Sequence, residues 1–125
     1  MCGIAGYIGK KRLSQNVLKN TLKSMHSRGP DNSGYTYYKI KDKYYYFLHS
    51  RLSIIDLNKR SSQPFKYKDY VIIFNGEIYN YIELRKILIS KGHKFKTNSD
   101  TEVLLKGLIQ WGTELIPRLN GMFAF

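Results

Sequence analysis

The amino-acid sequence predicts an α+β fold in which helices cover strands, and two observations predict it. Several short segments are rich in Tyr, Phe, Ile and Val, the residue types that strands favour. Other segments carry apolar residues every three to four positions, as one face of an amphipathic helix does. Because these segments come in alternating groups along 125 residues, we expect one domain with helices layered outside strands.

Turn formers and hydrophobic spacing define the elements of the first half. Apolar residues after Ser14, a suitable N-cap, follow helical spacing. Lys41-Asp42-Lys43 separates two aromatic runs, which favours a hairpin. In chain order we expect a strand over Gly3–Gly9, a helix from Ser14 to about His26, a loop over Ser27–Gly34, and strands over Tyr35–Ile40 and Tyr44–His49.

The second half of the sequence is expected to begin with extended and strand segments and to continue with two helices. Tyr70–Phe74 is nearly all apolar, which indicates a strand buried on both faces, and Asn75-Gly76-Glu77 is expected to break it. The other expectations are an extended segment over Arg51–Leu57, a polar segment over Asn58–Tyr67, a helix from Asn80 to Gly92, a helix from Ser99 or Asp100 to Gly112, a helical turn over Glu114–Leu119 and a strand over Met122–Phe125.

The net charge of +12 raises nucleic acid as a partner, but the charge distribution argues against it. Lysines are scattered one or two at a time, and no block of five like charges exists. No apolar run approaches the roughly 18 residues that span a bilayer. Lys10, Lys11 and Arg12 interrupt the N-terminus before any signal-peptide core could form. We therefore expect a cytoplasmic protein that binds neither nucleic acid nor membranes.

The single cysteine stands at position 2, where it can be a chance placement or a catalyst. Removal of Met1 would make Cys2 the first residue, with a free α-amine beside its thiol. Such an amine has a pKa near 7.7–8.0, compared with about 10.4 for lysine, so it can accept the thiol proton without help from histidine. Gly3 is expected to leave room for a substrate to approach the backbone.

Several sequence blocks support the catalytic interpretation of Cys2. They are Met1–Gly6, Arg28–Asp31, His49–Asp56, Gln63–Phe65, Phe74–Asn80, Ser99–Glu102 and Leu119–Phe125. The first block resembles the start of the class II glutamine amidotransferases, which use an N-terminal cysteine. The others, in the same order, resemble the asparagine synthetase branch of that family.

The resemblance implies the fold of the N-terminal nucleophile hydrolases, a sandwich of two sheets between helical layers (α/β/β/α). We expect this fold to be incomplete, because Met122–Phe125 is an apolar strand with nothing after it. Residues 1–125 would then be the N-terminal part of a glutaminase domain. No Ser-Gly-Gly phosphate loop occurs in the sequence, so the synthetase domain that binds ATP is expected to be absent.

The resemblance also implies a reaction. Cys2 would attack the carboxamide of L-glutamine to give a γ-glutamyl thioester and ammonia, and water would then release glutamate. The side-chain amide of Asn75 and the backbone N–H of Gly76 would bind the oxyanion. Without this context, Asn75-Gly76 would indicate an ordinary type I′ turn.

Glutamine must also be held by its α-carboxylate and α-ammonium groups. Arg51 is the expected carboxylate clamp, since a guanidinium binds a carboxylate in a bidentate way. Asp100, which could also cap a helix, is expected to bind the α-ammonium with help from Glu77. The residues implied to contact glutamine are Arg51, Leu52, Ser53, Ile54, Ile55, Asn75, Gly76, Glu77 and Asp100.

The remaining candidates are expected to be structural. Arg28–Asp31 would border the pocket and position it. Relatives often carry a histidine directly before this arginine, but Ser27 stands there, so His26 is not expected to be catalytic. His49 is expected to be structural and His93 to lie on the surface. The spacing of the histidines and Cys2 indicates no metal site.

The leading function is glutamine hydrolysis that feeds ammonia to an ATP-dependent synthetase site for asparagine formation. No cofactor is expected in this chain, and ATP and Mg²⁺ belong to the missing synthetase domain. The expected partners are L-glutamine and a C-terminal synthetase domain or partner subunit; a homodimer of the full-length protein stays open. The alternatives are an amidotransferase for a sugar or peptide carboxylate, and an inactive amidotransferase-like binding module, which a retained Met1 would favour.

Overall fold

The first half of the molecule is a three-stranded antiparallel sheet with one helix against it. The computed structural model describes residues 2–125. The sheet has the order β1 (Gly3–Gly9), β3 (Lys43–Arg51), β2 (Asn32–Ile40), and α1 (Gln15–Ser24) packs on one face. Ser14 caps α1 by accepting a hydrogen bond from the backbone N–H of Val17.

The central strand β3 has two faces with different roles, because successive side chains of a strand point to opposite sides. Tyr46 and Leu48 are buried against Leu18 of α1. His49 and Arg51 have the opposite parity and reach the second half of the molecule, where His49 contacts the backbone of Phe74. One face of the sheet thus holds the helix, and the other faces the candidate site.

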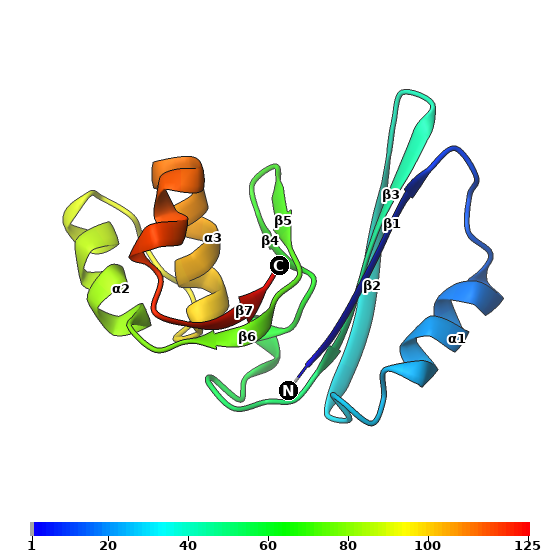
Figure 1. Cartoon of the computed structure of the whole chain (residues 1–125), viewed down its shortest axis with the longest axis horizontal. Helices are drawn as coiled ribbons and strands as arrows, with labels where there is room; N and C mark the ends of the chain where they lie inside the picture. Colours follow the sequence, from blue (N-terminus) through cyan, green and yellow to red (C-terminus); the bar gives the residue numbers. More distant parts are fainter. Residues whose placement is uncertain (1) are drawn as a thin grey trace.

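The second half is built from short strands and two helices. Its main core includes Phe74, Ile78, Leu88, Leu104 and Leu115, all buried. Figure 1 shows α1 on one side of the molecule, α2 and α3 on the other, and the strands between them. The elements are η1 (Lys59–Ser61), β4 (Phe65–Tyr67), β5 (Tyr70–Ile72), β6 (Asn75–Ile78), α2 (Tyr81–Ser90), α3 (Asp100–Trp111), η2 (Gly112–Arg118) and β7 (Gly121–Ala124).

Most predicted elements are confirmed. The first strand has the predicted bounds, and the hairpin turns at Lys41, which has a positive φ of 54°. The three helices are present, and Gly92 and Gly112 end α2 and α3 with positive φ. Mixed α and β structure with small antiparallel sheets is therefore confirmed.

Three predictions about strand boundaries are wrong. The predicted loop Ser27–Gly34 runs into β2, which begins at Asn32 because its pairing with the end of β3 continues through these turn formers. Arg51–Leu57 does not continue as an extended segment throughout, since β3 ends at Arg51, the backbone bends at Ile55 and Asp56 has a positive φ of 51°. The strand expected over Tyr70–Phe74 is not buried on both faces: β5 pairs only with β4, and Tyr70 is 50% exposed.

Asn75-Gly76-Glu77 does not break a strand; it forms one. β6 pairs antiparallel with β7, and Gly76 lies opposite Phe123. The sequence could not show this because the partner strand lies more than forty residues away along the chain. No helix among residues 2–125 is long and apolar enough to cross a membrane.

Candidate active site

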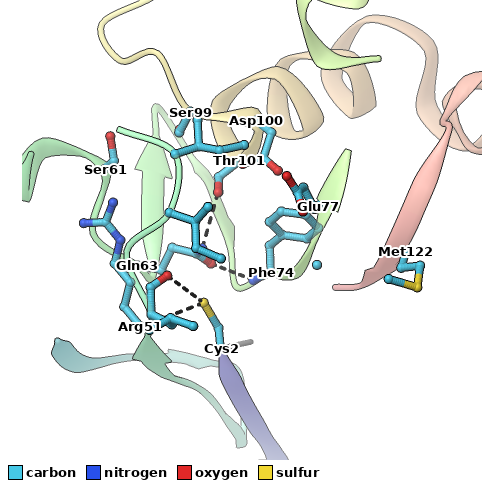
Figure 2. Close-up of a pocket in the computed structure, with 14 residues that line it drawn as sticks. Cys2, Arg51, Ser61, Gln63, Phe74, Glu77, Ser99, Asp100, Thr101 and Met122 are labelled. Carbon is cyan, nitrogen blue, oxygen red and sulfur yellow. Dashed lines mark hydrogen bonds between the residues drawn. The ribbon is translucent and has the colours of Figure 1, made fainter. Parts of the chain in front are cut away.

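A cleft of about 180 Å³ lies where the N-terminal end of β1 meets the second half of the molecule. Figure 2 shows Cys2 on one side of this cleft and Asp100 with Glu77 on the other. The cleft brings together eight of the predicted site residues: Cys2, Arg51, Leu52, Ile54, Ile55, Gly76, Glu77 and Asp100. Ser53 and Asn75 are not among the residues that line it.

The Cys2 thiol is held by the backbone of one residue in the loop after β3. It accepts a hydrogen bond from the N–H of Leu52 (3.4 Å) and lies within donating distance of the Leu52 carbonyl (3.6 Å). The Cys2 carbonyl accepts from Nε of Arg28 (3.1 Å). The next residue, Gly3, is in register with Ser50 of β3. Backbone pairing and these contacts together place the sulfur at the cleft.

Gly3 does not leave room for a substrate, contrary to the prediction. A Cβ at this position would lie 2.9 Å from Cβ of Met25, whose side chain fills that space. Glycine is required here because the end of α1 packs directly on the strand.

The Arg51 guanidinium is committed in part to its own loop. It is buried and donates hydrogen bonds to the carbonyls of Asp56 and Asn58 (3.2 Å for Asn58). A guanidinium has five N–H groups, so further donors are left for a ligand. Arg51 thus shapes the loop 52–58 and lines the cleft at once.

Asp56 ties the same loop to the start of α3. Its carboxylate accepts from the backbone N–H groups of Asn98 (2.8 Å) and Asn58 (3.2 Å) and pairs with Arg60 (3.4 Å). Desolvation by burial raises the pKa of Asp56, but these hydrogen bonds and the charge of Arg60 outweigh it and lower the pKa to about 2. Both sides of the cleft are therefore joined through one ionised carboxylate.

The Arg28–Asp31 segment packs against the end of β3. A Cβ on Gly29 would lie 2.2 Å from the Ser50 carbonyl oxygen, so only glycine permits this approach. The Asp31 carboxylate accepts from the N–H of Ser53 (2.7 Å), and the Asp31 N–H donates to the carbonyl of Arg51 (3.0 Å). This segment holds the loop whose Leu52 peptide contacts Cys2.

Asn75 and Gly76 lie at the start of β6, beside the cleft. A Cβ on Gly76 would lie 2.2 Å from the Met122 carbonyl oxygen and 2.7 Å from Cα of Phe123. Glycine is needed for close approach to β7, and not for the chain reversal that the sequence suggested. The Asn75 Oδ1 atom is buried and has no hydrogen-bond partner in the described part of the chain.

Asp100 is the first residue of α3 and is buried at the far side of the cleft. Its carboxylate accepts from the backbone N–H of Ile78 (3.2 Å), while Ser99 is the N-cap. The pKa of Asp100 is raised above its ordinary value, mainly by burial and also by the nearby charge of Glu77. Hydrogen bonds from the backbone oppose this shift. Of the two caps that the sequence allowed, Ser99 is the one in the structure, and the Asp100 carboxylate joins α3 to β6.

Sequence reasoning assigned no role in the site to six further residues of the cleft lining, which are Ser61, Gln63, Phe74, Ser99, Thr101 and Met122. Several of them stood inside the recognised blocks. Gln63 is buried and joins two segments: its Oε1 accepts from the N–H of Phe74 (2.6 Å) and its Nε2 donates to Oγ1 of Thr101 (3.3 Å). Block membership could have marked Gln63, but not its partners.

His49 and His93 have different surroundings. His49 is buried, and burial lowers its pKa to about 4; a hydrogen bond with Phe74 opposes this shift, and the charge of Arg51 adds to it. His93 is half-buried and lies 2.9 Å from Oε1 of Gln110. Within residues 2–125, no group of three or more His, Cys, Asp or Glu side chains could hold a metal ion.

Comparisons with known proteins point to one family. A model of the glutamine amidotransferase domain matches residues 1–125. The chain is 46% identical over 132 aligned residues to asparagine synthetase [glutamine-hydrolyzing] 1 of Bacillus subtilis, covering all of this chain and 20% of that protein. It is 40% identical to asparagine synthetase [glutamine-hydrolyzing] 1 of Arabidopsis thaliana and 35% identical to a putative asparagine synthetase of Methanocaldococcus jannaschii, covering all of this chain and 21% and 27% of those proteins. The chain thus spans about a fifth to a quarter of their length.

Proposed function

The chain belongs to the glutamine amidotransferase domain family, and we propose that it hydrolyses L-glutamine with Cys2 as the nucleophile. The observation that carries this proposal is the cleft, which has a thiol on one side, two carboxylates on the other and a guanidinium in its wall. An amino acid with a reactive side-chain amide matches that arrangement of charges. Its α-ammonium would meet the carboxylates and its α-carboxylate the guanidinium.

In the proposed reaction the α-amine of Cys2, freed by removal of Met1, takes the thiol proton. The sulfur then bonds to the carboxamide carbon, and the C–N bond breaks as the nitrogen accepts a proton and leaves as ammonia. Water attacks the resulting γ-glutamyl thioester, which releases glutamate and restores the thiol. The contact of Sγ with the Leu52 peptide would hold the nucleophile in place during both steps.

Two groups of β6 would stabilise the tetrahedral intermediates. The Asn75 side-chain amide and the Gly76 backbone N–H are the proposed oxyanion donors. Two features of the structure support this pair: Gly76 lines the cleft, and Asn75 is the residue directly before it at the start of the strand. Loss of one such donor typically costs about 100- to 1,000-fold in turnover.

The proposed substrate contacts divide between the two sides of the cleft. Arg51 would bind the α-carboxylate with the N–H groups that its loop does not use, and the backbone of Leu52–Ile55 would line the substrate. Asp100 and Glu77 would bind the α-ammonium. The contact between Asp100 and Ile78 leaves the second carboxylate oxygen free of backbone bonds from β6, which supports this role.

The fate of the ammonia is proposed from the relatives. Their names describe glutamine-hydrolysing asparagine synthetases, so amidation of aspartate is favoured over amidation of a sugar or peptide carboxylate. A synthetase domain or subunit that binds ATP and Mg²⁺ would receive the ammonia, in the cytoplasm and with a homodimer as one possible assembly. The order of helices, strands, strands and helices in Figure 1 supports the N-terminal nucleophile hydrolase sandwich, of which residues 1–125 would be the first part.

Glutamate release by protein with a mass-verified N-terminal Cys2 tests the proposal. We expect glutamine-dependent glutamate formation, and no activity above background for Cys2→Ala. A matched protein that retains Met1 should also be inactive, because its cysteine lacks a free α-amine. Equal glutamate release by the wild-type and Cys2→Ala proteins would contradict the assignment.

A further inference from the structure

The segment that carries Asn75 and Gly76 is held by side chains where it has no strand partner. Phe74 lies between β5, which ends at Ile72, and β6, which begins at Asn75. Every buried residue of this kind has a backbone N–H and a carbonyl that need partners. Phe74 is buried, so water cannot supply them freely.

His49 supplies the partner for the Phe74 carbonyl. Its Nε2 lies 3.1 Å from that oxygen. Because a carbonyl oxygen only accepts, Nε2 must carry the hydrogen. Nδ1 is buried without a partner in the described part of the chain, and burial lowers the pKa of His49, so the ring is neutral and Nδ1 is its unprotonated nitrogen. The ring is fully buried, at 0% exposure, and projects from the face of β3 that also presents Arg51.

Gln63 supplies the partner for the Phe74 N–H. Its Oε1 accepts from that group at 2.6 Å, and its Nε2 donates to Oγ1 of Thr101 at 3.3 Å. Gln63 is 7% exposed and Thr101 follows Asp100 at the start of α3. Figure 2 shows Gln63 between Phe74 and Thr101. The side-chain amide thus connects the same backbone residue to the helix that carries Asp100.

These hydrogen bonds form one chain across the site, from His49 through the backbone of Phe74 and the amide of Gln63 to Thr101. His49 is in register with Ile4 in the sheet, two residues from Cys2. This row of hydrogen bonds therefore links three elements. They are the strand pair that carries the nucleophile, the strand that carries the proposed oxyanion donors, and the helix whose Asp100 is proposed to bind the substrate.

We propose that His49 and Gln63 are positioning residues that clamp both backbone polar groups of Phe74 and so fix Asn75 and Gly76 relative to Cys2. The inference rests on the proposed function for its kinetic consequence. Neither side chain needs to touch glutamine. Displacement of the donors by about 1 Å can cost about 100-fold in rate, so loss of either bond should lower turnover more than substrate binding.

The test compares variants that remove the bonds with variants that keep a donor. His49→Leu removes the donor, whereas His49→Gln keeps an N–H near the position of Nε2. Gln63→Met removes both bonds at similar volume and serves as a second, independent variant if His49→Leu does not fold. The matched controls are His26→Leu and Gln15→Met, at exposed positions outside the clamp.

Two readouts are needed on the mature protein: kcat and KM for glutamine hydrolysis, and amide hydrogen exchange of residues 74–78. We expect His49→Leu and Gln63→Met to lower kcat by about 10- to 100-fold with KM close to wild type, and to lose exchange protection in this segment. His49→Gln should recover most of both, and the two controls should match wild type.

Unchanged protection of residues 74–78 in folded His49→Leu and Gln63→Met would overturn the clamp, whatever the turnover. A wild-type kcat in these variants would overturn the role of the clamp in positioning the oxyanion donors. An equal loss of kcat in His49→Leu and His49→Gln would overturn it as well. An inactive wild-type protein would contradict the proposed function instead, and the exchange data would still decide whether the clamp exists.

Discussion

The two halves of the molecule hold their parts of the site by different means. In the sheet β1-β3-β2, continuous backbone ladders bring Cys2 to the end of β3. In the second half, β4 to β7 are three or four residues long, and buried polar side chains join them to α3. Side-chain substitutions should therefore cost more in the second half, because there the side chains replace the ladder.

The same contrast appears between two ion pairs. Lys10 and Asp42 are 3.0 Å apart at the exposed tip of the sheet. Lys106 and Glu102 are 3.5 Å apart and fully buried on α3, with the Lys106 ammonium also 3.7 Å from the centre of the Tyr67 ring. Exposed ion pairs contribute little to stability. Loss of one partner of a buried pair is destabilising, because it leaves the other charge buried without a partner.

The largest expected effect is that of Glu102→Ala. The Glu102 carboxylate also accepts from the N–H groups of Lys96 and Thr97 and from the Thr97 hydroxyl. Its removal leaves the two backbone N–H groups and the Lys106 ammonium without this partner, which should lower the free energy of unfolding by about 3–5 kcal/mol. Urea denaturation followed by circular dichroism measures this change.

Asp42→Asn is the matched control for Glu102→Ala in the exposed pair. It should leave the urea midpoint close to wild type, since median exposed pairs contribute about 0–1 kcal/mol. A similar loss of stability in both variants would contradict the distinction between the two halves.

The sheet was easier to predict from the sequence than the second half, because its pairing depends on local signals. Alternation and turn formers are local signals, and the hairpin over β2 and β3 needs no others. The pairing of β6 with β7 depends on residues far apart in the chain, so Asn75-Gly76 could only be interpreted as a turn or a motif. Asn80 illustrates the same limit: its side chain bonds Arg118 and Asn120 and makes no cap hydrogen bond to its helix.

The candidate site was predicted through motifs, and the motifs do not encode geometry. Cys2, Gly76 and Asp100, which the motifs marked, lie around one cleft. His49 was expected to be structural, but its hydrogen bond and that of Gln63 could not be predicted, because both are made with the backbone of Phe74. A buried polar side chain shows its purpose only when its partner is known.

The pH dependence of stability tests the contact between the two halves that His49 of β3 makes with Phe74, with an effect of up to about 3 kcal/mol. The folded-state pKa of His49 is about 4, below its ordinary value of 6.5. Between these values the unfolded chain binds the proton and the folded chain does not, so stability falls as pH falls from 6.5 towards 4. His49→Gln cannot titrate and keeps a donor.

The measurement is the free energy of unfolding of both proteins from pH 7.5 to pH 4. We expect the wild-type protein to lose stability relative to His49→Gln across this range, while other titrating groups cancel in the difference. A constant difference between the two proteins would show that His49 is not buried as a neutral ring.

A further prediction compares one glycine in each half. Gly76→Ala would place a Cβ against the backbone of β7, where neither Met122 nor Phe123 can move without separating the strands. Overpacking of this kind typically costs about 1–3 kcal/mol. In the sheet, a Cβ on Gly6 would lie 3.5 Å from the Tyr46 carbonyl oxygen, an ordinary contact, so Gly6→Ala should be neutral or slightly stabilising.

Thermal unfolding of Gly76→Ala and Gly6→Ala measures the change in stability that each variant causes. Glutamate release shows which substitution also lowers activity. Gly76→Ala should lose activity by more than its loss of folded protein explains, because the displaced backbone N–H is a proposed oxyanion donor. Gly6→Ala should keep wild-type activity. If Gly76→Ala were as active and as stable as Gly6→Ala, the close contact of β6 with β7 could not be what places that donor beside Cys2.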